Sequence, residues 1–286
     1  MTALRLGVAA YPVTGPESFA AFAAKVDRFV ADGAAGGGEL LVLPEYACME
    51  LAAADQGAGD VARELRFVCA QRDALLELFA GCARRHKIWL QPGTLPWAEK
   101  GAVRNRAPLI SPDGALRLQD KRVMTRFESE SWGVTGGAAP VVFDTDWGRI
   151  GIAICYDVEF PSLVRAQTEQ GAWLVLAPSC TDTMHGFNRV RLSARARALE
   201  NQCFVAVSPT VGAAPHLATL DENRGAAAIF GPVDRGFPED GVITQGGQNE
   251  PGWVFATLDP QAIARVREDG AVRNFRDWPN NTDKAP

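Results

Sequence analysis

Apolar and polar positions alternate along the chain with two different periods, and this alternation predicts an α/β protein. Residues 3–10 form an apolar run typical of a strand. Residues 16–35 instead place apolar side chains three and four positions apart, which predicts an amphipathic helix. A second strand and helix follow, with a short apolar strand at 39–46 and a long helix from about 59 to 85. A strand at 87–93 comes next.

Two predicted hairpins interrupt this alternation in the middle of the chain. The segment "APLISPDGALRLQD" (107–120) has two strand-like runs around a Pro-Asp-Gly turn, and residues 139–155 turn at Asp146-Trp147-Gly148. The remaining pattern predicts a helix at about 160–170, a strand at 172–180, a helix at about 187–200, strands at 203–209, 226–232 and 252–259, and a short terminal helix with a mobile tail from about 270. This order predicts two mixed sheets packed face to face with helices outside them.

Three of the predicted strands end in a similar way. The segments "GGGELLVLPEY" and "EQGAWLVLAPSC" each follow a helix, continue as an apolar strand and stop at a proline and a polar residue. A third strand, "RIGIAIC", stops at Cys155. In α/β sheets, ligands bind beyond the carboxyl ends of the strands. We therefore expect the three polar ends to surround one pocket.

Composition narrows the class of protein without changing this picture. Of the 286 residues, 47% are hydrophobic and 22% are charged, which is typical of a soluble globular protein. No segment has the length and polarity of an interdomain linker, so residues 1–286 are expected to form a single domain. The formal net charge of −5 provides no basic field for a nucleic-acid partner.

Cellular location is predicted from three features of the sequence. The N-terminus lacks the charged segment and long apolar core of a secretory signal. No run approaches eighteen apolar residues, so neither a transmembrane helix nor a membrane partner is expected. The six cysteines form no CxxC pair and no dense framework, a pattern that suits free thiols in a cytoplasmic protein.

Several common kinds of functional site lack their sequence signature. The histidines, His86, His185 and His216, have no metal-ligand spacing, so no metal site is predicted. Neither a phosphate-binding glycine motif nor a G-x-S-x-G elbow occurs, so neither a nucleotide cofactor nor a serine nucleophile is predicted. Cysteine, carboxylate and lysine side chains therefore remain as the candidates for chemistry.

Cys155 is a candidate nucleophile because of where its strand ends. It closes the apolar run 150–154 and polar residues follow at once, whereas Cys69, Cys82 and Cys203 lie in apolar patterns typical of core packing. A strand-to-helix elbow exposes a thiol and points the next backbone N–H groups at a developing oxyanion.

A cysteine nucleophile needs partners, because a free thiol is mostly protonated at neutral pH. Without a nearby histidine, the alternative partners are a lysine cation and a carboxylate. Glu45 follows the buried strand in "LLVLPEY", and Lys121 follows the second strand of the first hairpin. Each residue also has an ordinary interpretation, as a loop glutamate and as a solvated lysine.

These three motifs together resemble those of the nitrilase superfamily of carbon–nitrogen hydrolases. "LLVLPEY" is similar to its glutamate motif, "RNRAPLISPDGALRLQDK" to the segment that leads to its lysine, and "GRIGIAICYDVEFP" to its cysteine elbow. "LVLAPSCTD" and "RARALENQCFVAVSPTVG" resemble later blocks, so the likeness covers about residues 4–260. One departure is Gln119, where the family usually has tyrosine. The chain most resembles a branch sometimes fused to an acetyltransferase domain, which is absent here.

The resemblance implies a fold, a site and an assembly. The fold is an αββα sandwich, and the assembly is a homodimer or larger oligomer joined through helices beside the active site. No metal or cofactor is implied. The implied catalytic triad consists of Glu45, Lys121 and Cys155. An auxiliary glutamate is also expected, for which Glu128 matches best by spacing and Glu130 is the alternative. Thr181, in the later "PSCTD" segment, is a candidate substrate-binding residue.

The expected reaction is hydrolysis of a non-peptide C–N bond in a small linear amide through a thioester on Cys155. Lys121 is expected to lower the thiol pKa and, with the backbone N–H of Tyr156, to hold the oxyanion. Glu45 is expected to move the protons. Glu159, four residues after the cysteine, is expected to disfavour an anionic substrate tail, and its alternative role is to cap the following helix.

Five alternatives stay open from the sequence. The same triad would attack the C≡N carbon of a nitrile, or cleave an N-carbamoyl amide. It would also support acyl transfer to an amine in place of hydrolysis. A relative without catalytic activity would act as a binding protein. A different enzyme would use Cys180 with His185 as a Cys–His pair.

Overall fold

The strands form one hydrogen-bonded network whose two halves meet between β1 and β10. The computed structural model describes residues 2–56 and 58–282. The first half contains β1 (Leu4–Pro12), β2 (Leu40–Leu43), β3 (Trp89–Pro92), β4 (Leu95–Glu99), β5 (Ala102–Ile110), β6 (Leu116–Asp120) and β14 (Gly252–Leu258). The second half contains β7 (Val142–Thr145), β8 (Gly148–Ile152), β9 (Leu174–Ser179), β10 (Phe204–Ala213), β11 (Glu222–Asn223), β12 (Ala228–Phe230) and β13 (Val242–Gln245). β1 and β10 join the halves through the pairs Tyr11↔Thr210 and Pro12↔Val211.

Parallel strands form the centre of each half, and antiparallel strands extend them. β2 pairs in parallel with β1 and β3, and β9 pairs in parallel with β8 and β10. The two predicted hairpins are confirmed as the antiparallel pairs β5–β6 and β7–β8. The carboxyl ends of β8, β9 and β10 therefore lie at one edge, as do those of β1, β2 and β3.

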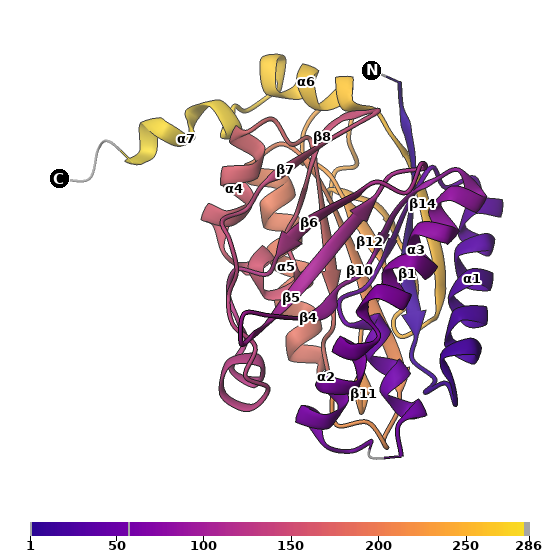
Figure 1. Ribbon diagram of the computed structural model, residues 1–286. Helices are drawn as coiled ribbons and strands as arrows, with labels where there is room; N and C mark the ends of the chain where they lie inside the picture. The colour runs from indigo at the N-terminus through magenta and orange to yellow at the C-terminus, as the bar shows by residue number, and fades with distance from the viewer. Residues whose placement is uncertain (1, 57, 283–286) are drawn as a thin grey trace.

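The two faces of β2 show how the halves and the helices pack. Leu40 and Val42 belong to a core cluster that also contains residues of β8, β9 and β10. Leu41 and Leu43 belong to a second cluster with residues of α1 (Phe19–Ala35) and α3 (Arg72–His86). Because successive side chains of a strand point to opposite faces, the first half contacts the second half on one face and helices on the other. Figure 1 shows α1 and α3 on one side of the strands, and α4 (Pro161–Glu169) and α5 (Met184–Glu200) on the other.

The prediction of one long helix from about 59 to 85 is wrong. Two helices occupy this stretch, α2 (Val61–Ala70) and α3, and Gln71 separates them with φ −90° and ψ 3°. α2 contacts the 3₁₀ helix η1 (Ala47–Ala54), whereas α3 contacts α1 and β3. The break lets the chain cover two differently oriented surfaces, which the apolar periodicity alone does not reveal.

The C-terminal part of the described chain is helical. α6 (Pro260–Asp269) and α7 (Asn274–Thr282) follow β14, and the guanidinium of Arg267 lies 4.1 Å from the centre of the Phe275 ring. The predicted short helix is confirmed, while residues 283–286 of the predicted tail lie outside the described residues. All six cysteines are free. Among the described helices, none has the length and apolar character needed to cross a membrane.

Candidate active site

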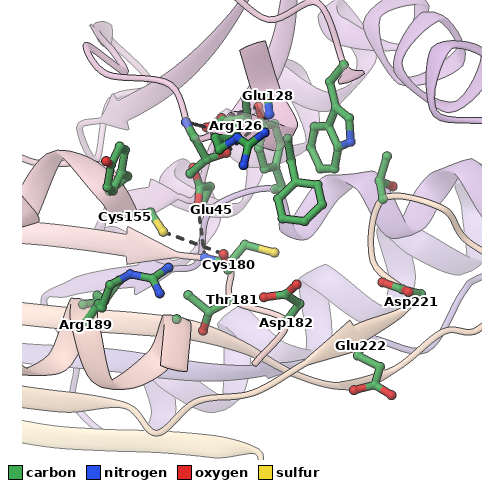
Figure 2. A pocket seen from close by; sticks show the side chains of 18 of the residues that line it. Glu45, Arg126, Glu128, Cys155, Cys180, Thr181, Asp182, Arg189, Asp221 and Glu222 are labelled. Atoms are coloured by element: carbon green, nitrogen blue, oxygen red, sulfur yellow. Dashed lines mark hydrogen bonds between the residues drawn. The ribbon is translucent and has the colours of Figure 1, made fainter. Parts of the chain in front are cut away.

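Three strand ends meet at one cavity, as the sequence predicts. Glu45 lies shortly beyond β2, Cys155 shortly beyond β8, and Cys180 directly after β9. All three line a cavity of about 520 Å³. The backbone N–H of Cys180 donates to Oε2 of Glu45 at 3.0 Å, which ties the end of β9 to the end of β2 (Figure 2).

The backbone turns sharply at Cys155. This residue has φ 47°, in the left-handed region that side-chain-bearing residues rarely occupy, and it opens the 3₁₀ turn η3 (Cys155–Glu159) before α4 begins at Pro161. The side chain is buried but lines the cavity. Its Sγ lies 3.7 Å from the carbonyl oxygen of Cys180 (Figure 2). The turn thus places the thiol at the inner end of the cavity.

Lys121 is buried between two carboxylates. Its ammonium donates to Oε1 of Glu45 at 2.7 Å and to Oε2 of Glu128 at 2.6 Å. Glu128 lies on the π-helical turn η2 (Phe127–Ser131). Glu130, the alternative by spacing, is exposed and pairs with Arg126 at the surface. The structure thus brings Glu128 to the lysine and leaves Glu130 away from it.

Sequence reasoning missed two polar residues that donate hydrogen bonds to these carboxylates. Nδ2 of Asn105 donates to Glu45 Oε1 at 2.8 Å and to Glu128 Oε1 at 2.9 Å, and Asn105 is fully buried. The hydroxyl of Tyr46 donates to the same Glu128 oxygen at 2.9 Å. One signal was available for Asn105, because strand alternation places it on the opposite face from its two arginine neighbours.

Asp157 was also missed, although it lies in the cysteine motif. Its carboxylate accepts the backbone N–H groups of Arg122 at 2.9 Å and Val123 at 2.8 Å, immediately after Lys121. The cysteine turn and the lysine loop are thereby linked. Burial raises the pKa of Asp157 from 3.8 to about 6, against the lowering effect of these two hydrogen bonds.

The two carboxylates beside Lys121 have pKa values displaced in opposite directions. Burial raises the pKa of Glu45, and the Glu128 charge adds to this effect, so that together they outweigh the Lys121 ammonium. Burial also acts to raise the pKa of Glu128, but Lys121 and hydrogen bonds from Thr125 and Asn105 bring it below its usual value. The pKa of Lys121 is raised, because the two carboxylates outweigh the cost of burying its charge. Glu45 is therefore the better proton acceptor of the pair.

The thiol of Cys155 is held by opposing effects on its pKa. Lys121 does act to lower the pKa of Cys155, but burial and the Glu45 carboxylate together raise it well above its ordinary value. A protonated thiol beside a carboxylate needs that carboxylate to accept its proton during attack.

The outer cavity contains the other predicted residues. Tyr156, Thr181 and Glu159 all line it. The Thr181 hydroxyl donates to the carbonyl oxygen of Arg224 at 2.7 Å, so it holds a loop. Glu159 pairs with Arg189 at 3.4 Å, which offsets the negative charge that the sequence placed beside the cysteine. The α4 N-cap is Phe160, without a side-chain cap, so helix capping by Glu159 is not seen.

The Cys180–His185 alternative finds no support in the geometry. The Cys180 thiol lies 3.6 Å from Oδ1 of Asn223, whereas His185 is exposed and is not among the residues that line the cavity. Within the described residues, no cluster of three His, Cys, Asp or Glu side chains could hold a metal ion.

Comparison with known proteins defines the class to which this fold and site belong. The family model of the carbon-nitrogen hydrolases matches residues 5–268. The chain therefore belongs to the carbon–nitrogen hydrolase family.

Individual relatives agree with this assignment. A probable hydrolase of Bacillus subtilis, YhcX, is 31% identical over 96% of this chain and 53% of its own length, so the chain spans about half of that relative. A deaminated glutathione amidase of Synechocystis is 28% identical, over 81% of this chain and 84% of its own. A solved mutant of the amidase from Nesterenkonia sp. AN1, which carries the acetamide moiety of fluoroacetamide on its active-site cysteine, has a TM-score of 0.75 at 21% identity, over 99% of this chain and 97% of its own.

Proposed function

We propose that this protein hydrolyses the C–N bond of a small linear amide through a thioester on Cys155. The observation that carries the proposal is the buried contact of Lys121 with Glu45, which lines the cavity together with Cys155. A thiol, a carboxylate with a raised pKa and a fixed cation supply the nucleophile, the base and the charge stabilisation that acyl transfer needs.

In the first half of the proposed reaction, Sγ of Cys155 attacks the amide carbon while Glu45 accepts the thiol proton. The carbonyl oxygen becomes negatively charged, and the Lys121 ammonium and the backbone N–H of Tyr156 stabilise it. One such hydrogen-bond donor typically lowers the activation barrier by about 3 kcal/mol. Glu45 then protonates the departing nitrogen, the C–N bond breaks, and ammonia or an amine leaves a thioester on Cys155.

In the second half, water attacks the thioester carbon while Glu45 accepts a proton from the water. The C–S bond breaks, the thiol regains its proton from Glu45, and the carboxylic acid leaves. Glu128 positions Lys121 throughout, because its low pKa keeps it charged. The covalent addition of the acetamide moiety of fluoroacetamide to the active-site cysteine of the Nesterenkonia amidase supports a nucleophilic role for the cysteine.

Ammonia release from a panel of short amides, nitriles and carbamoyl compounds tests the proposal. The variant Cys155→Ala should be inactive, and Cys82→Ala, which removes a buried thiol from α3, should keep activity. Intact-mass analysis of the wild type quenched during turnover should detect an acyl adduct, which Glu45→Gln should fail to form. Turnover by Cys155→Ala would refute the scheme, preferential nitrile turnover would favour a nitrilase, and the absence of both turnover and adduct would favour a binding protein.

Charges at the cavity mouth support a neutral or cationic substrate end. Asp182, Asp221 and Glu222 line the outer cavity (Figure 2). Among the described residues, no lysine or arginine forms an ion pair with Asp182 or Asp221. The two cavity arginines, by contrast, are already paired, Arg126 with Glu130 and Arg189 with Glu159. An amide with a distal amine should therefore be turned over faster than one with a distal carboxylate.

We further propose a single hydrolase domain with a four-layer αββα arrangement, which assembles as a homodimer or larger oligomer. The shared core between the strand halves supports the inner layers. Leu192 and Leu199 lie seven residues apart on α5 and are 58% and 41% exposed, near Val233. A second copy of the chain that packs on this face would bury them. Sedimentation of Leu192→Asp should shift toward the monomer, and an unchanged mass would contradict this interface.

A further inference from the structure

Glu64 is a buried carboxylate that contacts one wall of the cavity from outside. It lies on α2 and its side chain is fully buried. Oε1 accepts the backbone N–H of Gly59 at 2.7 Å and of Ala218 at 2.8 Å. Oε2 accepts both the backbone N–H of Thr219 at 3.0 Å and its hydroxyl at 2.6 Å.

The segment that Glu64 holds, residues 214–221, is the wall segment of the cavity. Ala218, Thr219 and Asp221 line the cavity, and the segment connects β10 to β11. Leu217 and Leu220 anchor it in the second core cluster. Figure 2 shows Asp221 on the opposite side of the cavity from Cys155. The wall is therefore placed to contact the distal part of a substrate and not the carbon that is attacked.

Hydrogen bonds alone stabilise the buried carboxylate of Glu64. Within the described residues, no lysine or arginine pairs with it, and four donors from the wall segment and the loop before α2 surround its oxygens. A buried carboxylate without a cation depends on such donors, and the donors in turn are fixed by it. A purely apolar contact would leave the backbone N–H groups of Ala218 and Thr219 without a partner.

We propose that Glu64 is a positioning residue for substrate selection, which fixes the wall segment against the distal part of the substrate. This inference rests on the proposed amidase function, because it concerns the same cavity. A substrate that fills only the inner end of the cavity does not depend on the wall. A longer substrate does, since a small displacement of a positioning group is sufficient to reduce its rate.

The variant Glu64→Gln tests this role, because the amide keeps the shape of the carboxylate but directs an NH₂ group at one pair of donors. The measured quantity is the ratio of kcat/KM for hexanamide to that for acetamide, from ammonia release. We expect this ratio to fall about tenfold, mainly through a higher KM for hexanamide. The variant Thr219→Val, which removes only the hydroxyl donor, should move the ratio in the same direction and keeps the test available if Glu64→Gln does not fold.

Glu50→Gln is the matched control. Glu50 is a second fully buried carboxylate, but it accepts hydrogen bonds from Tyr11, Thr14 and Lys25, away from the residues that line the cavity. Its substitution should lower stability without changing the substrate ratio. An equal change in the ratio for Glu50→Gln, or an unchanged ratio for Glu64→Gln, would overturn the proposal.

Alkylation of Cys155 separates this inference from the proposed function. The rates of labelling by 2-bromoacetamide and 2-bromohexanamide are measured by intact mass, with Cys155→Ala subtracted. In each case Sγ of Cys155 forms a thioether as bromide leaves and the thiol proton is released, so no hydrolysis is required. The ratio of the 2-bromohexanamide rate to the 2-bromoacetamide rate should fall in Glu64→Gln even if no amide is turned over. A lower labelling ratio without amide turnover would refute the amidase proposal alone. An unchanged labelling ratio refutes the role of Glu64 alone.

Discussion

Asp157 links the cysteine turn to the lysine loop, and its replacement by asparagine tests the electrostatic cost of this link. The side chain is 4% exposed, and its carboxylate accepts the backbone N–H groups of Arg122 and Val123. Burial nevertheless raises its pKa from 3.8 to about 6, because desolvation outweighs those two hydrogen bonds. The ionised form of Asp157 is therefore less stable in the folded protein than in water.

The sign of the pH dependence follows from linkage. A carboxyl group whose pKa is higher in the folded state binds protons more tightly when folded, so it favours folding at low pH. This contribution is lost as the pH rises through about 6. A pKa of about 6 in place of 3.8 lowers the free energy of unfolding by about 3 kcal/mol once the group is fully ionised. About 1.4 kcal/mol of this loss of stability occurs between pH 5 and pH 8.

Urea unfolding of the wild type and of Asp157→Asn at pH 5, 6, 7 and 8 measures this contribution. The asparagine stays neutral throughout, so the free energy of unfolding of the wild type should fall relative to the variant by about 1.4 kcal/mol over this range. Loss of one of the two hydrogen bonds adds an offset that does not vary with pH. A constant difference between the proteins, or a wild type that gains relative stability as the pH rises, would refute the reasoning.

Three further predictions concern the polar network around Lys121. Glu128→Gln should move the acid limb of the kcat/KM pH profile to lower pH, because the Glu128 charge helps to raise the pKa of Glu45; an unmoved limb contradicts this. Tyr46→Phe removes a buried donor to Glu128 and should cost about 1–3 kcal/mol of stability in urea unfolding, with an unchanged midpoint as the contrary result. Asn105→Ala should reduce kcat more than Tyr46→Phe does, since Asn105 contacts both carboxylates; the reverse order in a turnover assay would show that Glu45 is held without it.

The parts of the site that sequence reasoning found share one property. Glu45 and Cys155 are polar or reactive residues at the end of an apolar run, and such ends are visible in a single sequence. The convergence of these ends follows from parallel strands, whose carboxyl ends lie at the same edge of a sheet. Lys121 was found less directly, because it follows a hairpin strand and only the family resemblance distinguished it from a solvated lysine.

The parts that were missed depend on contacts between distant segments. Tyr46 and Glu128 are separated by 82 positions, and no local pattern pairs them. Asn105 lies in a strand whose alternation places it inward, but the alternation does not show which carboxylates it meets. The break at Gln71 has the same origin, because α2 and α3 end where they do to cover separate surfaces. The local periodicity of apolar residues predicts these elements, whereas tertiary packing determines where they end and which residues they contact.

The charge balance of the cluster argues against a resting thiolate. Lys121 already neutralises one charge between Glu45 and Glu128, so one net negative charge is buried there. A thiolate on Cys155 would add a second, in surroundings where burial and Glu45 already raise the thiol pKa. We infer that the negative charge forms on the substrate oxygen instead, at the moment when Glu45 is neutralised by the thiol proton. Lys121 then faces one carboxylate fewer, and its ammonium becomes available to the oxyanion when the reaction needs it.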